Sequence, residues 1–219
     1  DRKDQPRVAI GAKLAANLIV AAGADRVISI DFHQHQIQGF FDIPVDHLYA
    51  APVLTKYFRA LELEDLVVVA PDVGAAKMAR GFARRLGASF AIIDKRRPQA
   101  NMSEVLNVVG DVDGLTCLLV DDMVDTGGSL ANAIFALKDR GASTVYAAAT
   151  HALLSADATA TLSAAPIEEM IVTNTIHTPD AKHFDRLKVL SVADLLAQAI
   201  NYVHSNESVS QLFETPPDN

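Results

Sequence analysis

The stretch 118–129 (LLVDDMVDTGGS) contains the residue types that could bind a phosphorylated sugar. An apolar run leads into Asp121 and Asp122, a turn over 125–129 follows, and the next residues predict a helix over 130–140. Glycines in such a turn let the backbone approach a ligand closely. The N–H groups at the start of a helix attract an anion. The turn therefore predicts a phosphate site.

The two adjacent carboxylates define the rest of the ligand. Asp121 and Asp122 repel a phosphate, but they accept hydrogen bonds from sugar hydroxyls or hold magnesium through water. A ligand with a phosphate at one end and a diol at the other fits both parts. We therefore predict a ribose 5-phosphate site, which is completed by the residues of the turn: Asp125, Thr126, Gly127, Gly128 and Ser129. The alternative is an ordinary strand-to-helix loop in which Asp, Thr and Ser only cap the helix.

Composition limits the class of protein. The 219 residues are 50% hydrophobic, enough for one or two domains with a sizeable core. The formal charge of −8 and the lack of a long basic run argue against a nucleic-acid partner. The single cysteine, Cys117, predicts a reducing, cytoplasmic location. No apolar stretch reaches membrane-spanning length, so no membrane partner is expected. The chain begins at Asp1 without a methionine, and we expect a fragment.

Short apolar runs alternate with segments of helical periodicity, which predicts an α/β fold with a mostly parallel sheet flanked by helices. The predicted strands are 26–31, 66–70, 89–94, 104–109, 116–121, 145–150, 169–173 and 187–190. The predicted helices are 8–22, 51–61, 74–86, 130–140, 155–163 and 193–204. Ligands of such sheets bind at the carboxyl ends of the strands. Polar residues at the predicted strand ends should therefore gather at one edge: Asp31 and His33, Asp72, Asp94 and Lys95, Asp121 and Asp122, and Thr150 and His151.

Two of these residues could bind a metal. His33 lies in a histidine- and glutamine-rich segment, which could contact a metal or a nucleotide phosphate or could be a solvated polar loop. No further Cys or His cluster completes a zinc site, so zinc is not expected. Asp72 could hold Mg²⁺ together with His33, or it could cap the helix that follows. The local sequence leaves both roles open.

Three consecutive cations follow the strand predicted over 89–94. Lys95, Arg96 and Arg97 could be a surface charge run. Pro98 and the polar residues after it favour a mobile loop that closes over phosphates. Lysine provides a compact charge and arginine a bidentate fork, and phosphoryl transfer uses both to neutralise transition-state oxygens.

Taken together, these motifs resemble the ribose-phosphate pyrophosphokinase family over nearly the whole chain. Segment 31–46 (DFHQHQIQGFFDIPVD) is similar to the family signature, with Phe32 where Leu or Ile is usual. Segment 92–98 (IIDKRRP) resembles the flexible catalytic loop, 120–129 the diphosphoribosyl loop, and 206–213 the C-terminus. Residues 74–77 (GAAK) depart from the usual Gly-Gly helix start.

The resemblance implies a reaction and a role for several residues. The family transfers the β,γ-pyrophosphoryl group of ATP to the C1 hydroxyl of ribose 5-phosphate, giving 5-phosphoribosyl 1-pyrophosphate and AMP. Lys95 and Arg97 would be catalytic, and Arg97 would also bind ribose 5-phosphate with Asp121 and the turn. His33 and Asp72 would contact Mg²⁺, and Arg2 and His33 would contact ATP. The resemblance also implies a homohexamer.

The resemblance further implies a type I phosphoribosyltransferase-like fold with the remnant of a second, similar domain. Residues 49–190 would form a C-terminal domain. Residues 1–48 and 191–213 would belong to an N-terminal domain that lacks about its first hundred residues, and 214–219 would be a disordered tail. We then expect an apolar exposed surface on helix 8–22. The fragment would also lack most of the nucleotide site, and would be inactive alone if that site is essential.

Two other functions share some of these features. A phosphoribosyltransferase, which consumes the activated sugar, has the same acidic and glycine-rich loop. The cations at 95–97 and the segment 31–46 argue against it. A non-catalytic regulatory subunit of the synthase would be expected to lose loop cations, yet Lys95 and Arg97 are present.

Lys95→Ala in the full-length parent protein should lower turnover by about 100-fold or more, because it removes a cation from the transferred phosphates. Affinity for ribose 5-phosphate should change little, since the turn at 125–129 binds that ligand. Steady-state kinetics with ATP, ribose 5-phosphate and Mg²⁺ measures both quantities. Ordinary turnover in the variant would rule out the assigned role.

Overall fold

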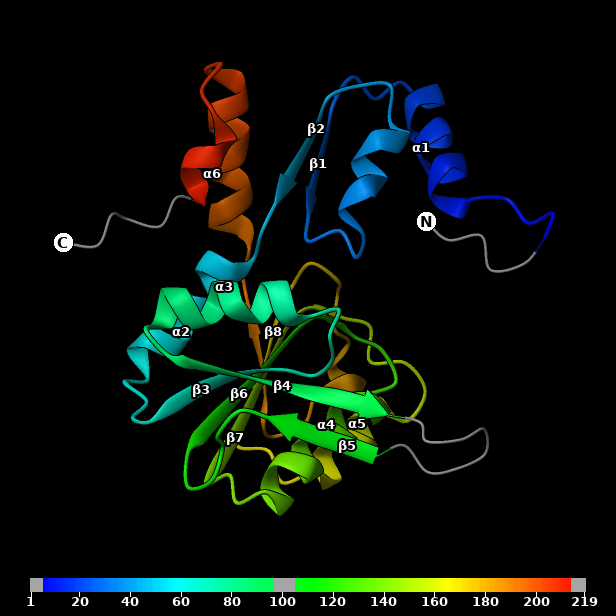
Figure 1. Ribbon diagram of the computed structural model, residues 1–219. Helices are drawn as coiled ribbons and strands as arrows, with labels where there is room; N and C mark the ends of the chain where they lie inside the picture. Colours follow the sequence, from blue (N-terminus) through cyan, green and yellow to red (C-terminus); the bar gives the residue numbers. More distant parts are fainter. Residues whose placement is uncertain (1–5, 97–104, 214–219) are drawn as a thin grey trace.

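The computed structural model describes residues 6–96 and 105–213, which form a large seven-stranded sheet and a smaller two-stranded one. The large sheet has the order β5-β4-β3-β6-β7-β8-β9, and its neighbours are parallel except for β4 and β5 (Figure 1). Its strands are β3 (Leu66–Ala70), β4 (Ser89–Arg96), β5 (Val105–Val109), β6 (Thr116–Val124), β7 (Thr144–Ala152), β8 (Met170–Thr173) and β9 (Leu187–Leu190).

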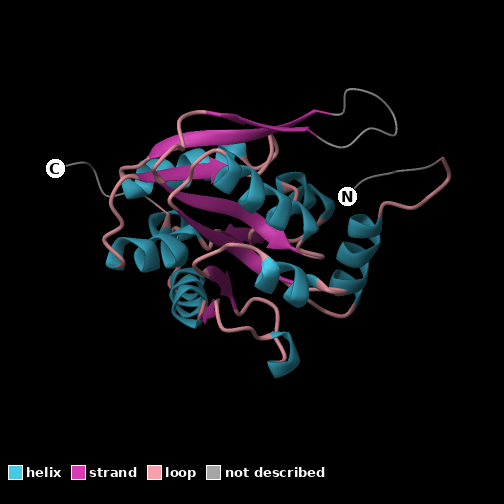
Figure 2. Cartoon of the chain, turned by 90° about the horizontal axis from the view of Figure 1, so that it is seen from below, coloured by secondary structure: helices cyan, strands magenta, loops and turns pink. Residues whose placement is uncertain are grey.

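Helices cover both faces of the large sheet (Figures 1 and 2). The first layer contains α2 (Ala51–Ala60), α3 (Ala76–Leu86) and α6 (Ala193–His204), and the second contains α4 (Gly128–Asp139) and α5 (Ala158–Ala164). Successive residues of a strand point to opposite faces. Val68 accordingly packs in the core with the first layer, and Val67 in the core with the second. Burial on both faces explains why these strands are continuous apolar runs, and the predicted fold class is confirmed.

The smaller unit contains α1 (Gly11–Ala21), β1 (Val27–Ile30) and β2 (Val45–Leu48), and in Figure 1 it lies above the large sheet, as α6 does. β1 and β2 pair in parallel, from Val27–Val45 to Ile30–Leu48. Arg26 donates to the carboxylate of Asp46 at 2.5 and 3.1 Å, which fixes the end of this pair. The sequence did not predict β2, since four residues with two polar side chains give too weak a pattern.

Short 3₁₀ turns complete the structure at η1 (His35–Phe40), η2 (Asp180–Lys182) and η3 (Val209–Leu212). The predicted exposed apolar surface on the first helix is confirmed: Leu14 is 56% exposed and Leu18 is 62% exposed, while Ala16 is the buried residue of α1. None of the helices in the described ranges has the length and apolar character needed to cross a membrane.

Three strands extend beyond their predicted ends. The predictions ended at Asp94, Asp121 and Thr150, whereas β4 continues to Arg96, β6 to Val124 and β7 to Ala152. The cause is pairing: β4 continues against antiparallel β5, and β6 and β7 pair as far as Val124–Ala152. Polar residues that were predicted to follow strands therefore lie within them, and those predicted boundaries were wrong.

Candidate functional site

Carboxylates gather at the carboxyl edge of the large sheet. Asp121 lies in β6, and its Oδ1 accepts a hydrogen bond at 2.9 Å from the N–H of Asp122. Burial, then the side chain and charge of Asp122 and the charge of Asp72, together raise the pKa of Asp121 to about 7. Asp72 follows β3, the strand next to β6. The acids of two adjacent strand ends thus act on one another, and this edge favours a bound cation.

His33 joins this edge from the smaller unit. Its Nδ1 lies 2.8 Å from Oδ2 of Asp122, although the two residues are 89 positions apart. The histidine side chain is 53% exposed and the carboxylate 16% exposed, so the imidazole forms the solvent side of the pair. The structure thus brings His33 against Asp122, a contact that the sequence did not predict.

Asp72 lies in the turn that leads from β3 into α3. Its Oδ1 accepts a hydrogen bond at 3.1 Å from the N–H of Ala75, and a side chain at Gly74 would place a carbon 3.1 Å from the same oxygen. Asp72 therefore holds the turn before α3, but the N-cap of α3 is Ala75 and no described side chain caps this helix, so the helix-capping role that the sequence left open is wrong. The charge of Asp72 also raises the pKa of Asp121, which shows that the two carboxylates lie near one another. A metal-binding role for Asp72 remains a proposal.

The described residues contain no group of three His, Cys, Asp or Glu side chains that could hold a metal. Mg²⁺ does not need such a group, because it usually binds through one or two carboxylates and keeps water and substrate phosphate oxygens as its other ligands. The carboxylates at this edge fit that mode of binding.

The turn between β6 and α4 has an anion-binding shape. Gly127 has φ 75°, and a Cβ there would lie 3.1 Å from Cγ of Leu162, so this position requires glycine. Gly127 is the N-cap of α4, and no described side chain caps that helix. The first N–H groups of α4 thus remain available to a ligand. The exposed side chains of Thr126 and Ser129 flank them.

A residue that the sequence analysis did not select holds this turn. Ser155 donates its hydroxyl to Oδ1 of Asp125 and its N–H to the carbonyl of Asp125 at 3.0 Å. The N–H of Leu153 donates to the carbonyl of Val124 at 3.0 Å. The segment after β7 therefore fixes the start of the turn. Ser155 had no local signal, because its partner is 30 residues away.

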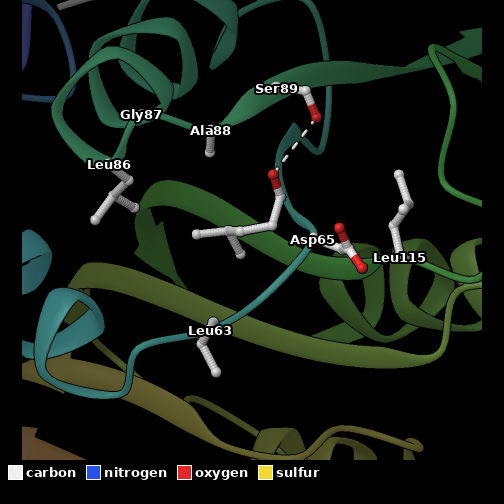
Figure 3. Close-up of a pocket in the computed structure, with 8 residues that line it drawn as sticks. Leu63, Asp65, Leu86, Gly87, Ala88, Ser89 and Leu115 are labelled. Carbon is white, nitrogen blue, oxygen red and sulfur yellow. Dashed lines mark hydrogen bonds between the residues drawn. The ribbon is translucent and has the colours of Figure 1, made fainter.

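A separate pocket of about 390 Å³ lies at the opposite edge of the sheet (Figure 3). It is lined by Leu66 and Ser89, the first residues of β3 and β4, and by Leu115, which precedes β6. The hydroxyl of Ser89 donates to the carbonyl of Leu66 at 3.4 Å across it. Asp65 is the titratable residue of its lining, and the pocket lies apart from the acidic edge.

Three of the predicted site residues are not placed. Arg2, Arg97 and the side chain of Lys95 lie outside the described part of the chain. Their roles remain predictions.

The fold and the site define an α/β protein in which a helix start suited to an anion and a set of carboxylates lie together at the carboxyl edge of a parallel sheet. The model of the phosphoribosyl synthetase-associated domain matches residues 97–214. Ribose-phosphate pyrophosphokinase from Synechocystis sp. is 54% identical over 97% of this chain, and that from Bacillus subtilis is 51% identical over 97%. The chain spans 64% and 67% of the lengths of these relatives.

A solved structure agrees with the sequence comparisons. Phosphoribosylpyrophosphate synthetase from Mycobacterium smegmatis superimposes with a TM-score of 0.86 and 45% identity, over 94% of this chain and 67% of that one. The chain therefore belongs to the ribose-phosphate pyrophosphokinase family, as the resemblance of its motifs predicted.

Two glycine substitutions separate folding from ligand approach at the turn. Gly127→Ala should lower the free energy of unfolding by about 1–2 kcal/mol, because alanine is strained in the left-handed region. Gly128→Ala should unfold at no lower temperature, since a Cβ there meets nothing within 4 Å. The added methyl should still weaken ribose 5-phosphate binding about tenfold, which is about 1.4 kcal/mol. Thermal unfolding and calorimetric titration check both, and unchanged affinity in Gly128→Ala would contradict close approach of the ligand.

Asp121→Asn should stabilise the fold in a pH-dependent manner. The pKa of Asp121 is raised from its ordinary 3.8 to about 7, so the folded chain keeps a proton that the unfolded chain has released. The contribution of this proton to the free energy of unfolding is fully present below pH 3.8, and it is lost as the pH rises to about 7. Asparagine does not ionise. The melting temperature of Asp121→Asn relative to wild type should therefore rise between pH 5 and pH 7.5 and then level off. Each kcal/mol of added stability corresponds to about 2–4 °C.

Asp139→Asn is the matched control, because it removes one exposed carboxylate at the end of α4. Its effect on the melting temperature should vary less with pH than that of Asp121→Asn. Equal profiles for the two variants would contradict the raised pKa at Asp121.

Proposed function

We propose that the protein from which this chain comes transfers the β,γ-pyrophosphoryl group of ATP to the C1 hydroxyl of ribose 5-phosphate. The products would be 5-phosphoribosyl 1-pyrophosphate and AMP. The observation that carries the proposal is the placement of the uncapped start of α4 directly after the strand that presents Asp121 and Asp122. One end of this arrangement suits a phosphate and the other suits a diol.

The residues divide the substrate between them. The amides at the start of α4, with the hydroxyls of Thr126 and Ser129, would bind the 5-phosphate. Asp121 and Asp122 would accept hydrogen bonds from the ring hydroxyls. Binding at both ends would hold the sugar in one orientation, which converts an encounter into a positioned reaction.

The transfer step forms a bond from the C1 oxygen to the β-phosphorus of ATP and breaks the bond from the β-phosphorus to the oxygen that bridges it to the α-phosphorus. AMP leaves with that bridging oxygen, and the proton of the C1 hydroxyl is released to solvent. Lys95 and Arg97, assigned by family resemblance, would neutralise the charge on the transferred phosphates. Mg²⁺ would supply further neutralisation of phosphate oxygens when it is bound. His33 and Asp72 would hold it, and the paired Asp122 and the raised pKa of Asp121 support an affinity of this edge for a cation.

We extend the proposal to the organisation of the whole protein. Residues 49–190 would be the C-terminal domain, and residues 1–48 with 191–213 would belong to an N-terminal domain, in which Arg2 and His33 contact ATP. The separate two-stranded sheet and the exposed apolar side chains of α1 support this division. A homo-oligomer, a hexamer by resemblance, and a reducing cytoplasmic location complete the proposal.

The first experiment uses this chain and needs no catalysis. Isothermal titration calorimetry should show binding of ribose 5-phosphate with a Kd below about 1 mM, a range common for metabolic substrates. Unphosphorylated ribose should bind at least about tenfold more weakly, a loss of about 1.4 kcal/mol. Ribose 5-phosphate should bind to Asp121→Ala with a similar loss. Asp111→Ala is the control for loss of an exposed acid. Equal affinity in Asp121→Ala would contradict the proposed diol contact.

The second experiment separates the three candidate reactions in the full-length parent protein. AMP release from ATP and ribose 5-phosphate with Mg²⁺ supports the proposed activity. Pyrophosphate release from 5-phosphoribosyl 1-pyrophosphate and a base would support a phosphoribosyltransferase instead. If neither AMP nor pyrophosphate is released, the result would support a non-catalytic subunit.

A further inference from the structure

We infer that Thr150 and His151 are positioning residues that hold the turn after β1 against the large sheet, so that the His33 imidazole meets Asp122. The inference rests on the proposed function only in treating His33 as part of the substrate edge. The contact itself joins the smaller unit, which provides His33, to the large sheet, which provides Asp122.

The carboxylate of Asp31 is the centre of this junction. Asp31 is 6% exposed and has φ 43°, a left-handed conformation that is unfavourable for a residue other than glycine. Its Oδ2 accepts hydrogen bonds from the N–H of Ala50 at 2.9 Å and from the hydroxyl of Thr150 at 2.7 Å. Strained backbone of this kind persists only where the surroundings determine it. Here the surroundings include a strand of the large sheet, 119 residues away.

His151 holds the backbone of the same residue. Its Nε2 lies 2.9 Å from the carbonyl oxygen of Asp31, and because that oxygen only accepts, Nε2 must carry the hydrogen. The other ring nitrogen, Nδ1, lies 2.9 Å from the hydroxyl of Thr175. The hydroxyl of Thr173 donates to the carbonyl of Thr150 at 2.7 Å. Residues at the end of β8 thus orient both Thr150 and the His151 ring.

Two N–H groups of the turn are also paired. The N–H of Asp31 donates to the carbonyl of Leu48 at 2.9 Å, and the N–H of Phe32 donates to Nε2 of His47 at 3.0 Å. The turn is therefore fixed from the smaller unit by β2 and from the large sheet by β7. His33 is the next residue along the chain, so its position follows from both attachments.

The register of the large sheet explains why this attachment sets the distance to Asp122. In the pairing of β6 with β7, Asp121 is opposite Ala149 and Met123 is opposite His151. Asp122 and Thr150, which lie between these pairs, are therefore at the same level of the sheet. At this level of the sheet Thr150 contacts Asp31 and Asp122 contacts His33. The pairing of β6 with β7 therefore positions both contacts.

The test measures the His33 imidazole directly by ¹⁵N NMR of histidine-labelled chain without any ligand. Asp122→Ala, which removes every hydrogen-bonding group from this side chain, defines the Nδ1 chemical shift of the broken contact. Thr150→Val, which keeps the shape but removes the hydroxyl, should move the His33 Nδ1 shift more than half of the way to that value. Thr150→Ser keeps a hydroxyl at this position, so its His33 Nδ1 shift should lie closer to the wild-type value than to the value of the broken contact. A purely structural role for the hydroxyl would not move this signal in a chain that stays folded.

Thr55→Val is the matched control, because Thr55 is also buried and donates its hydroxyl to Ala51 within α2. It should leave the His33 signal unchanged. If Thr150→Val does not fold, His151→Ala carries the test, with His151→Gln as the conservative variant that can still donate to Asp31. The inference is overturned if a folded Thr150→Val or His151→Ala chain keeps the wild-type His33 shift, or if Asp122→Ala leaves that shift unchanged.

Calorimetry with ribose 5-phosphate separates this inference from the proposed function. The affinity of Thr150→Val should stay within twofold of wild type, because Ser155 and the start of α4 hold the phosphate turn independently. Failure of the wild-type chain to bind the sugar phosphate would contradict the proposed function, while the NMR result would stand. A large loss of this affinity with an unchanged His33 shift would overturn the positioning role.

Discussion

The parallel pairing of β6 with β7 is the constraint on which the site depends. The two strands remain paired from Thr116–Thr144 to Val124–Ala152, beyond the point at which their apolar character ends. Because of this extension, Asp121 and Asp122 lie within a regular strand, and the turn before α4 begins directly after Val124. It also brings Ser155 against Asp125, and Thr150 and His151 against Asp31. The pairing of β6 with β7 thus positions these side chains, while Asp72 is placed separately by the turn after β3.

That placement has an electrostatic cost. Asp121 is partly buried beside Asp122 and within reach of the charge of Asp72, and its pKa is raised first by burial and then by its interactions with these two acids. A bound cation or the hydroxyls of a sugar would relieve part of this repulsion. The site is therefore arranged for a ligand at the expense of the folded chain, which is common where carboxylates must stay close together.

The smaller unit is held to the large sheet by buried polar contacts at this edge. Asp31 of the smaller unit accepts hydrogen bonds from Ala50, which precedes α2, and from Thr150 of β7, and its carbonyl accepts one from His151. Hydrogen bonds of this kind depend strongly on direction, so they position His33 more sharply than apolar packing would. Helix α1, which carries exposed apolar side chains, lies in Figure 1 on the side of the smaller unit away from α6.

The local sequence determined most of the elements and the core of the site. Apolar runs identified the seven strands of the large sheet, and β3 and β9 were predicted with their observed bounds, as was α6. The DTGGS turn was recognisable because glycine and hydroxyl residues at a helix start have a local physical reason. The tertiary structure alone decided how far β6 and β7 extend, that His33 meets Asp122, and that Thr150, His151 and Ser155 hold the two turns. These contacts join residues from 30 to 120 positions apart, and no local pattern of side chains specifies a partner at such a distance.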